Sequence, residues 1–384
     1  MDIAEARARA EQAPDSHIFI SLTDEHGPGP VVAVKDLIDV RGVPTTGGGV
    51  ILPRVPAAAD APLVARIRAG GGRIIGKTNL YEWAYGASSR NPHFGDVRNP
   101  RDAGRSAGGS SSGSAAAVAA GLCDWAVGTD TAGSVRVPAS LCGVVGFRPS
   151  HGVIPADGVI PLARSLDTVG ALAPSVRVAA EAVALMADRP DIATAPARDP
   201  RTLRLASPAG WLDGLDAQTA RVWAHVGAAL PEVKLPDRIV MNELGGTIQA
   251  AEATTFHRDW MRRWPDRYSA DVLAKLAAGL EVRAVDYLRA CEERNRVRDA
   301  VQAALDGWDA LVLPATAVVA PRLDGPEERD ALLRFTRPFS LTGHPCIVIP
   351  APAAGLPVGI QLVGRAGADG QLAAVAAALE ASWR

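Results

Sequence analysis

The segment over residues 108–150 constrains the fold more than any other part of this sequence. It holds two glycine-rich loops that carry serines, GGSSSG at residues 108–113 and GTDTAGS at residues 128–134. Between them, residues 114–120 are nearly all alanine, which predicts a helix that can pack very close to its neighbours. Such loops bring the backbone close to whatever the serines contact, so the segment points to a chemical site.

Strand-like and helix-like segments alternate along the chain. Strands are predicted at residues 31–35, 73–77, 125–128, 311–314 and 347–350, further extended pieces at 142–147 and 158–161, and helices at 61–69, 114–120 and 369–381. This alternation predicts an α/β fold in one domain over residues 1–384, with a large central mixed, mostly parallel sheet covered by helices on both faces. Within it, a variable helix-rich substrate region is expected at about residues 200–308.

Composition excludes several classes of protein. The 384 residues are 48% hydrophobic and 21% charged with a net charge of −2, so no strong field attracts nucleic acid or a membrane surface. No apolar run approaches the roughly 20 residues needed to span a bilayer. The N-terminus alternates acidic and basic residues, which predicts a short exposed helix and not a signal peptide. The four cysteines are scattered, so we expect reduced thiols, a cytoplasmic location, and neither a metal site nor a cofactor.

One nucleotide-binding pattern is rejected on its context. Residues 71–78 read GGRIIGKT and match the phosphate-binding loop of nucleotide-binding proteins. That loop needs a strand before it and a helix after it. Here a predicted helix precedes the pattern and a predicted strand lies inside it, so we interpret the segment as a helix-turn-strand unit.

A lysine is the remaining candidate for a base that could activate a serine. A serine hydroxyl is a poor nucleophile until a base removes its proton. His93 and His151 lie in no nucleophile motif and are interpreted as loop residues. Lys35 lies at the end of an apolar strand, where burial would lower its pKa toward the neutral range. Taken alone, such a lysine is more often a strand-end residue that faces solvent.

The set of motifs resembles the amidase signature family along nearly the whole chain. Besides the two serine loops, the family order holds for AVKD at residues 33–36, GKTN at 76–79, SLDTVG at 165–170 and GLP at 355–357. The resemblance implies an amidohydrolase that cleaves a carboxylic amide to an acid and ammonia or an amine through an acyl-enzyme. Ser134 would be the nucleophile, Ser110, held by a cis peptide bond, would relay the proton between Ser134 and Lys35, and Lys35 would be the base.

The resemblance also implies how the nucleophile loop works. The backbone N–H groups of Thr131, Ala132, Gly133 and Ser134 would form the oxyanion hole. Many family members have glycine where Ala132 stands, and alanine narrows the loop geometry because it does not readily adopt positive φ. The resemblance further implies that Asp130 and Arg136 support the loop through hydrogen bonds. Ser111 is expected either to hydrogen-bond the loop or, equally, to face solvent as a turn serine.

Substrate preference is less readable. VVGFRPSHG at residues 144–152 resembles plant indole-3-acetamide amidohydrolase, whereas GTDTAGS and ARSLD at 163–167 resemble allophanate hydrolase. Arg164 could clamp a substrate carboxylate, against the alternative of a surface arginine. Trp83 and Tyr85 could wall the pocket, although core packing is the commoner role of such aromatic residues.

Two other functions stay open at this point. One is the glutaminase-like component of a tRNA-dependent amidotransferase, against which the short segment before Lys35 argues. The other is a non-catalytic amidase-like binding module, which would lose the serine or the lysine. As partners we expect a small-molecule amide, no nucleic acid and no membrane, with a homodimer left open.

Overall fold

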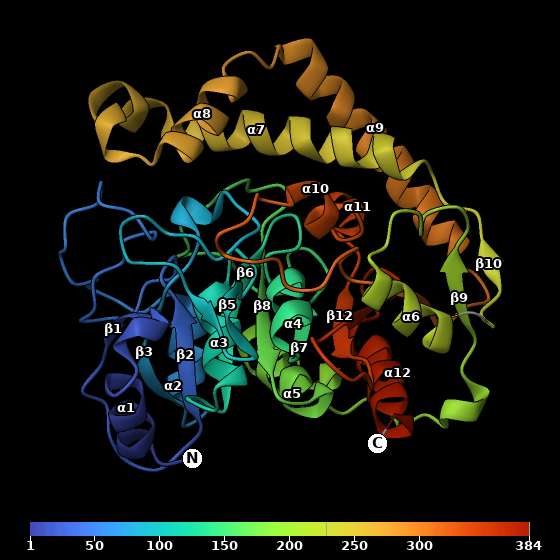
Figure 1. The fold of residues 1–384 in the computed structure, drawn as a ribbon, viewed down its shortest axis with the longest axis horizontal. Coiled ribbons are helices and arrows are strands. Elements are labelled where there is room, and N and C mark those ends of the chain that lie inside the picture. Colours follow the sequence, from blue (N-terminus) through green and yellow to red (C-terminus); the bar gives the residue numbers. More distant parts are fainter. Residues whose placement is uncertain (228, 384) are drawn as a thin grey trace.

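An 11-stranded sheet runs through the computed structural model, which describes residues 1–227 and 229–383 (Figure 1). Its strands, in spatial order, are β1 (Phe19–Leu22), β3 (Arg73–Thr78), β2 (Val31–Lys35), β6 (Trp125–Asp130), β8 (Thr168–Ala173), β7 (Val145–Arg148), β12 (Cys346–Pro350), β13 (Gly359–Val363), β11 (Ala310–Pro314), β9 (Leu205–Pro208) and β10 (Glu232–Val233). Strands from both halves of the chain share this one sheet, which confirms the predicted single-domain α/β fold.

The sheet is mixed, as predicted, but the expectation that it is mostly parallel was wrong. β2 pairs in parallel with β3 and β6, and β9 pairs in parallel with β11 and β10. The remaining six pairings are antiparallel. β8 lies between β6 and β7 and is antiparallel to both. β6 and β7 therefore run in the same direction and are connected through a helix, but they are not neighbours in the sheet. Helix-strand alternation predicts strand direction better than it predicts which strands pair.

Two segments predicted as extended differ in the structure. Helix α4 (Arg136–Cys142) occupies the start of the predicted strand at 142–147, and β7 begins only at Val145. The predicted piece at 158–161 contributes a single isolated bridge, between Val159 and Ile38. Residues 158–161 lie beside the chain that follows Lys35, whereas the start of β7 pairs with Ala173 at the opposite end of the sheet.

Helices cover both faces of the sheet because side chains alternate along each strand. Val31 and Ala33 of β2 pack with α1 (Ile3–Glu11), α3 (Ser112–Ala119) and α4. Val32 and Val34 point the other way, into the core formed with α2 (Pro62–Ala69), α5 (Val176–Ala187) and α12 (Asp369–Ser382). Helix α1 was predicted to be exposed, but its small apolar stripe is buried, with Ile3 only 2% exposed.

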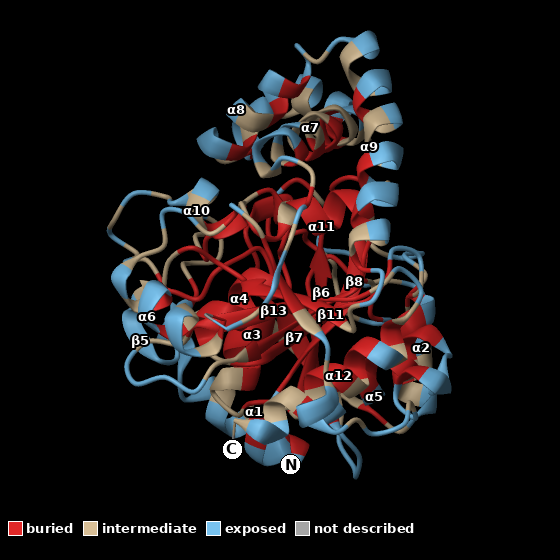
Figure 2. Cartoon of the chain, turned by 90° about the vertical axis from the view of Figure 1, so that its right-hand side faces the viewer, coloured by how far each residue is buried: buried red, intermediate tan, exposed pale blue. Residues whose placement is uncertain are grey.

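The helix-rich region forms a layer of its own beyond the sheet. Helix α6 (Ala217–Val226) is followed by α7 (Arg238–Arg263), α8 (Ala270–Gly279) and α9 (Ala284–Ala304), of which α7 to α9 lie across the top of the molecule (Figure 1). Their outer surface is exposed and their inner surface is buried (Figure 2). Two short helices, α10 (Arg329–Leu333) and α11 (Arg337–Thr342), lie beneath α7, and a small two-stranded sheet pairs β4 (Arg98–Asn99) with β5 (Asp102–Ser106).

The segment that matches a phosphate-binding loop is a helix-turn-strand unit, as interpreted from the sequence. Helix α2 ends at Ala69, and β3 follows from Arg73. Lys77, the lysine of the pattern, is fully buried and pairs with Asp36 at 2.8 Å, so its ammonium is already neutralised inside the protein. Among residues 1–227 and 229–383, no helix is long and apolar enough to cross a membrane.

Candidate active site

Lys35 ends β2 and points into a cluster of hydroxyl groups. It lies on the same face of the strand as Val31 and Ala33, so it points toward α3, and the serine loop that begins α3 meets its ammonium. Lys35 Nζ lies 2.7 Å from Ser110 Oγ, 2.9 Å from Ser111 Oγ and 2.8 Å from Thr129 Oγ1. Three hydroxyl oxygens therefore match the three N–H groups of the ammonium.

The hydrogen bonds around Ser111 separate its role from that of Ser110. Ser111 Oγ donates its proton to the Thr129 carbonyl oxygen at 3.1 Å, so it can only accept from Lys35. Ser110 Oγ has no other partner within the described residues, so its proton is free to move toward a neutral Lys35. Ser110 is thus the hydroxyl best placed to exchange a proton with the lysine.

Burial sets the charge state of Lys35. The side chain is fully buried, and removal from water lowers its pKa from 10.5 to about 7, while the carboxylates of Asp130 and Asp167 oppose that shift. A lysine with this pKa is partly neutral near pH 7, which a general base must be. The strand-end lysine of the sequence is therefore a buried residue and not one that faces solvent.

The loop that carries Ser134 is held against the loop that carries Ser110. The peptide bond between Gly109 and Ser110 is cis, as the family resemblance implied, and the Ser111 N–H donates to the Ser134 carbonyl oxygen at 3.1 Å. Ser134 itself is 5% exposed. Its hydroxyl makes no hydrogen bond to Ser110 in this structure, so the expected relay is in place only between Ser110 and Lys35.

The backbone ahead of Ser134 has unpaired N–H groups. Within the described part of the chain, the N–H groups of Ala132, Gly133 and Ser134 have no hydrogen-bond acceptor. Gly133 has a φ of +141°, and a Cβ atom at this position would lie 2.2 Å from the side-chain oxygen of Thr336. Ala132 has no positive φ, so alanine fits at this position without strain. These N–H groups are therefore available as donors to a bound group.

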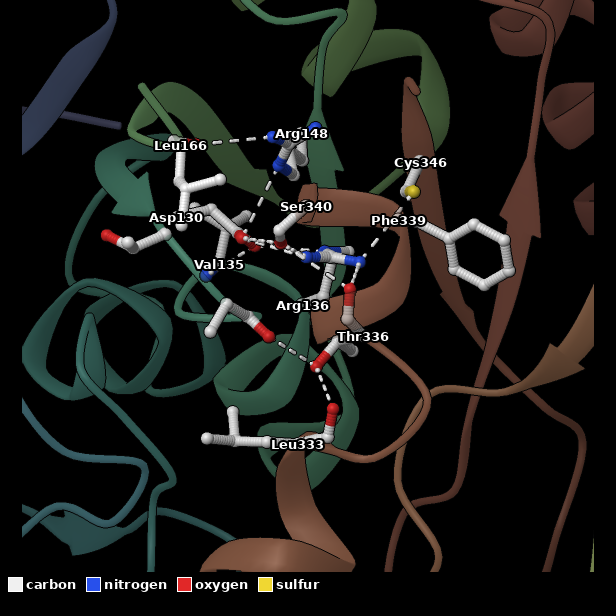
Figure 3. Close-up of polar contacts among 12 residues, drawn as sticks. Asp130, Val135, Arg136, Arg148, Leu166, Leu333, Thr336, Phe339, Ser340 and Cys346 are labelled. Carbon is white, nitrogen blue, oxygen red and sulfur yellow. Dashed lines mark hydrogen bonds and ion pairs between the residues drawn. The ribbon is translucent and has the colours of Figure 1, made fainter. Parts of the chain in front are cut away.

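A buried ion pair lies beneath this loop. Arg136 donates through Nε and Nη2 to both carboxylate oxygens of Asp130, at 2.9 and 2.8 Å (Figure 3). Burial raises the pKa of Asp130, but Arg136 and the Val135 N–H outweigh it and lower that pKa to about 2. Arg136 Nη1 also donates to the Thr336 carbonyl oxygen at 2.8 Å, which ties the nucleophile loop to α11.

Three residues contact the site without having been assigned a role from the sequence. Thr129 is the third partner of Lys35, and Asp167 accepts a hydrogen bond from the Thr131 hydroxyl at 2.5 Å. Thr336 donates to the Ala132 carbonyl oxygen at 2.7 Å. Thr129 and Asp167 lie inside the recognised motifs, so the signal was present, whereas Thr336 lies 204 residues from Ala132 and only the fold brings it there.

Two adjoining cavities open beside the hydroxyl cluster. The first, of about 520 Å³, is lined by Thr129, Thr131 and Asp167 and ends at Phe256 of α7. The second, of about 680 Å³, lies under the helical layer and is mostly apolar. Arg164 is exposed and lines both cavities, so it stands where a substrate group would pass.

The two aromatic candidates line neither of these cavities. Trp83 is 1% exposed and packs against His257, with ring centroids 5.1 Å apart, and against Trp260 and Tyr268. It holds α7 against the sheet, as a core aromatic residue does. Tyr85 is also buried, next to α10 and α11. In the described ranges, no group of three His, Cys, Asp or Glu side chains could hold a metal ion.

Comparisons with known proteins place the chain in one family. The family model named Amidase matches residues 1–209 and 219–373. The chain is 37% identical to AtzE, a component of the 1-carboxybiuret hydrolase of Pseudomonas sp. strain ADP, over 86% of this chain and 79% of that protein. It is 32% identical to the A component of glutamyl-tRNA(Gln) amidotransferase from Halobacterium salinarum, over 92% and 95% of the two chains.

Solved structures agree with the sequence matches. The crystal structure of an amidase superposes with a TM-score of 0.92 at 33% identity, covering 100% of this chain and 95% of the other. The match thus extends over the serine loops, the lysine strand and the helical layer together. The chain belongs to the amidase signature family and is an enzyme that hydrolyses amide C–N bonds.

Proposed function

We propose that Ser134, Ser110 and Lys35 form a catalytic triad that hydrolyses an amide through an acyl-enzyme. Ser134 Oγ attacks the amide carbonyl carbon, and its proton passes to Ser110 while the Ser110 proton passes to neutral Lys35. The observation that carries this proposal is the 2.7 Å contact between Lys35 Nζ and Ser110 Oγ in a fully buried site.

The second half of the reaction returns the proton. The tetrahedral intermediate expels the amine as the C–N bond breaks, and the amine takes the proton that Lys35 releases through Ser110. Water then attacks the Ser134 ester, the same two groups accept and return its proton, and the acid leaves. In both halves the free N–H groups of Ala132, Gly133 and Ser134 stabilise the oxygen that becomes negative.

The supporting residues would keep this geometry. Ser111 and Thr129 hold the Lys35 ammonium in place, and the ion pair of Asp130 with Arg136 fixes the turn that leads to Ser134. Thr131 is oriented by Asp167 and adds a fourth residue to the oxyanion loop. None of these groups needs to exchange a proton with the substrate.

The substrate would be a small amide that enters past Arg164. The cavity beside Thr131 leads to the apolar space under α7, which would hold an uncharged part of the molecule. Arg164 has no ion-pair partner among the described residues, so it could attract a substrate that carries a carboxylate as it enters. 1-Carboxybiuret, which the AtzE relative hydrolyses by name, carries such a group.

The similarity to the amidotransferase components supports a second candidate, a glutaminase that works with partner chains. Ammonia release from simple amides by the isolated chain would favour the independent amidase, and release only from glutamine with added partners would favour the amidotransferase component. A binding module without catalysis is disfavoured because Lys35, Ser110 and Ser134 are all present.

Removal of the nucleophile tests the triad. Ser134→Ala should release no ammonia from any amide that the wild type hydrolyses, while the circular dichroism spectrum and the melting temperature stay unchanged. Ser140→Ala, a buried serine on α4 that lies outside the hydroxyl cluster, is the matched control and should retain turnover. Ammonia release at the wild-type rate by folded Ser134→Ala would refute the mechanism.

A further inference from the structure

Arg337, the first residue of α11, carries a guanidinium group that lacks partners. Its Nε and Nη2 atoms are buried and make no hydrogen bond within the described residues. Arg329, the first residue of α10, likewise has a buried Nε without a partner. A buried donor that finds no acceptor costs about 1–3 kcal/mol, so an acceptor from outside the protein would relieve this arrangement.

The carboxylates near these two arginines pair with other groups. Asp330 is exposed and already pairs with Arg334 at 3.3 Å. Asp271, which acts on Tyr85, pairs with Lys275 at 2.6 Å, and Glu327 lies 4.0 Å from the same lysine. Burial and the nearby positive charge of Arg329 lower the pKa of Arg337 to about 9. Within the described residues no carboxylate pairs with Arg337, so an anion from outside the protein could fill that place.

Tyr85 completes the cluster. It is buried, and both Arg329 and Arg337 lie close enough to act on its hydroxyl group and to lower its pKa, although burial raises that pKa more. A tyrosine hydroxyl is a donor that can be shared with an anion held by the arginines. Tyr85 comes from the segment before the serine loop, so two distant parts of the chain build this cluster.

The cluster lies beside the nucleophile loop. Thr336, which precedes Arg337, donates to the Ala132 carbonyl oxygen at 2.7 Å. Ala87, two residues after Tyr85, packs in one apolar cluster with Ala132 and with Leu332 of α10. The residue before Arg337 is therefore tied to the proposed oxyanion loop, at the start of α11 and under α7 (Figure 1). Arg164 lies in the cavities beyond Thr131 and has no part in this cluster.

We propose that Arg337, together with Arg329 and the Tyr85 hydroxyl, binds a carboxylate group of the amide substrate. The Nε and Nη2 atoms of an arginine form a fork that matches the two oxygens of a carboxylate. The substrate class is then an amide of a dicarboxylic acid or of a related acid, held by its charged end. This inference rests on the proposed function, because it identifies the substrate of the same site.

The experiment compares acids with their neutral counterparts. The wild type and the Arg337→Gln variant are assayed with malonamate, succinamate and glutaramate, and with the diamides malonamide, succinamide and glutaramide. For the preferred acid, Arg337→Gln should lower kcat/KM by about tenfold or more, mainly through KM, while the diamide values stay unchanged. Arg337→Lys keeps the positive charge but cannot bind both carboxylate oxygens side by side, so its kcat/KM for the acid should fall less than that of Arg337→Gln.

A matched control keeps the result specific. Arg334→Gln removes a neighbouring arginine whose guanidinium already has Asp330 as a partner, so it should not change the preference for acids over diamides. If Arg337→Gln does not fold, Arg329→Gln and Arg337→Lys carry the same comparison. The proposal is wrong if acids and diamides lose activity equally, or if diamides are hydrolysed and none of the acids is.

Binding gives a readout that does not depend on turnover. Malonate, succinate or glutarate should raise the melting temperature of the wild type and of Ser134→Ala, but not that of Arg337→Gln. This separates the two proposals, since an inactive chain that still binds the acid through Arg337 contradicts only the triad. A wild type that none of the three dicarboxylates stabilises contradicts the anion site.

Discussion

Asp167 accepts a hydrogen bond from the Thr131 hydroxyl at 2.5 Å, which connects a buried carboxylate to the proposed oxyanion loop. Its other oxygen accepts from the N–H groups of Leu162 and Ala163 at 2.9 and 3.0 Å. Burial raises the pKa of Asp167 to about 6 in spite of these bonds. The same carboxylate also raises the pKa of Lys35, so one residue orients the loop and tunes the base.

Replacement of this carboxylate should change the pH profile of the enzyme. In the wild type, kcat/KM should fall as the pH drops through about 7, where Lys35 gains a proton, and more steeply below about 6, where Asp167 also gains one. In Asp167→Asn the steeper part should vanish. The remaining midpoint should move below 7, because a negative charge that favours the Lys35 ammonium has been removed.

The rate of Asp167→Asn should also fall at its best pH. With the asparagine oxygen facing the N–H groups of Leu162 and Ala163, its amide nitrogen faces Thr131 and turns that hydroxyl from a donor into an acceptor, which changes how Thr131 is oriented, so we expect a loss of about tenfold. Measured rates from pH 5 to 9 check both effects. An acid limb with the wild-type slope and midpoint would contradict the role given to Asp167.

Lys35 should make the stability of the protein depend on pH in a specific window. Its pKa is about 7 when folded and 10.5 in its ordinary state, so between these values the unfolded chain binds a proton that the folded chain does not. The free energy of unfolding should therefore rise with pH across this window by up to about 1.4 kcal/mol per unit, and the contribution should be constant below pH 7.

The Lys35→Met variant isolates this contribution, because the other titrating groups are shared. The difference in unfolding free energy, wild type minus Lys35→Met, should increase from pH 7 to pH 10 in urea titrations. The variant should also be inactive. A difference that does not change with pH would mean that the folded lysine keeps its ordinary pKa.

The sequence predicted the reacting groups better than their supports. Lys35 and the serine loops could be found because each lies in a short motif whose residues are close in the chain. Thr336 could not, because its contact with Ala132 depends on α11 returning to the nucleophile loop late in the fold. The position of β8 between β6 and β7 was not predicted for the same reason, because long-range packing decides which strands pair.

Trp83 shows that a residue close to a motif in the sequence need not line the site. A motif near the site suggested a pocket wall, but Gly47 and Gly49 lie against the Trp83 ring, and a Cβ at Gly47 would lie 2.3 Å from Trp83 Cζ3. The absence of side chains at these two glycines leaves room for the Trp83 ring. The residues that bury Trp83, among them His257 and Trp260 of α7, lie far from it in the sequence.

The buried pair of Asp130 and Arg136 should be costly to break. Arg136→Gln would leave the Asp130 carboxylate buried with Arg148, at 3.5 Å, as its remaining ion-pair partner among the described residues. We expect a loss of about 3–5 kcal/mol in the free energy of unfolding, together with loss of activity. Arg201→Gln, which removes an exposed partner of Asp199, is the control and should change stability by less than about 0.5 kcal/mol. Urea titrations of both variants measure the contrast, and similar small losses would contradict it.

Ala132 and Gly133 should differ sharply in what they tolerate, although they are neighbours in the nucleophile loop. Gly133→Ala forces a side chain into a φ of +141° and places Cβ 2.2 Å from the Thr336 side-chain oxygen, so the loop must shift. A displaced oxyanion donor costs about 10²–10³ in kcat, and we expect a loss of that order. Ala132→Gly keeps its N–H group and removes only a methyl group, so kcat should stay near the wild-type value. Steady-state rates on one amide decide the matter: equal losses in both variants would show that neither backbone position is specifically required.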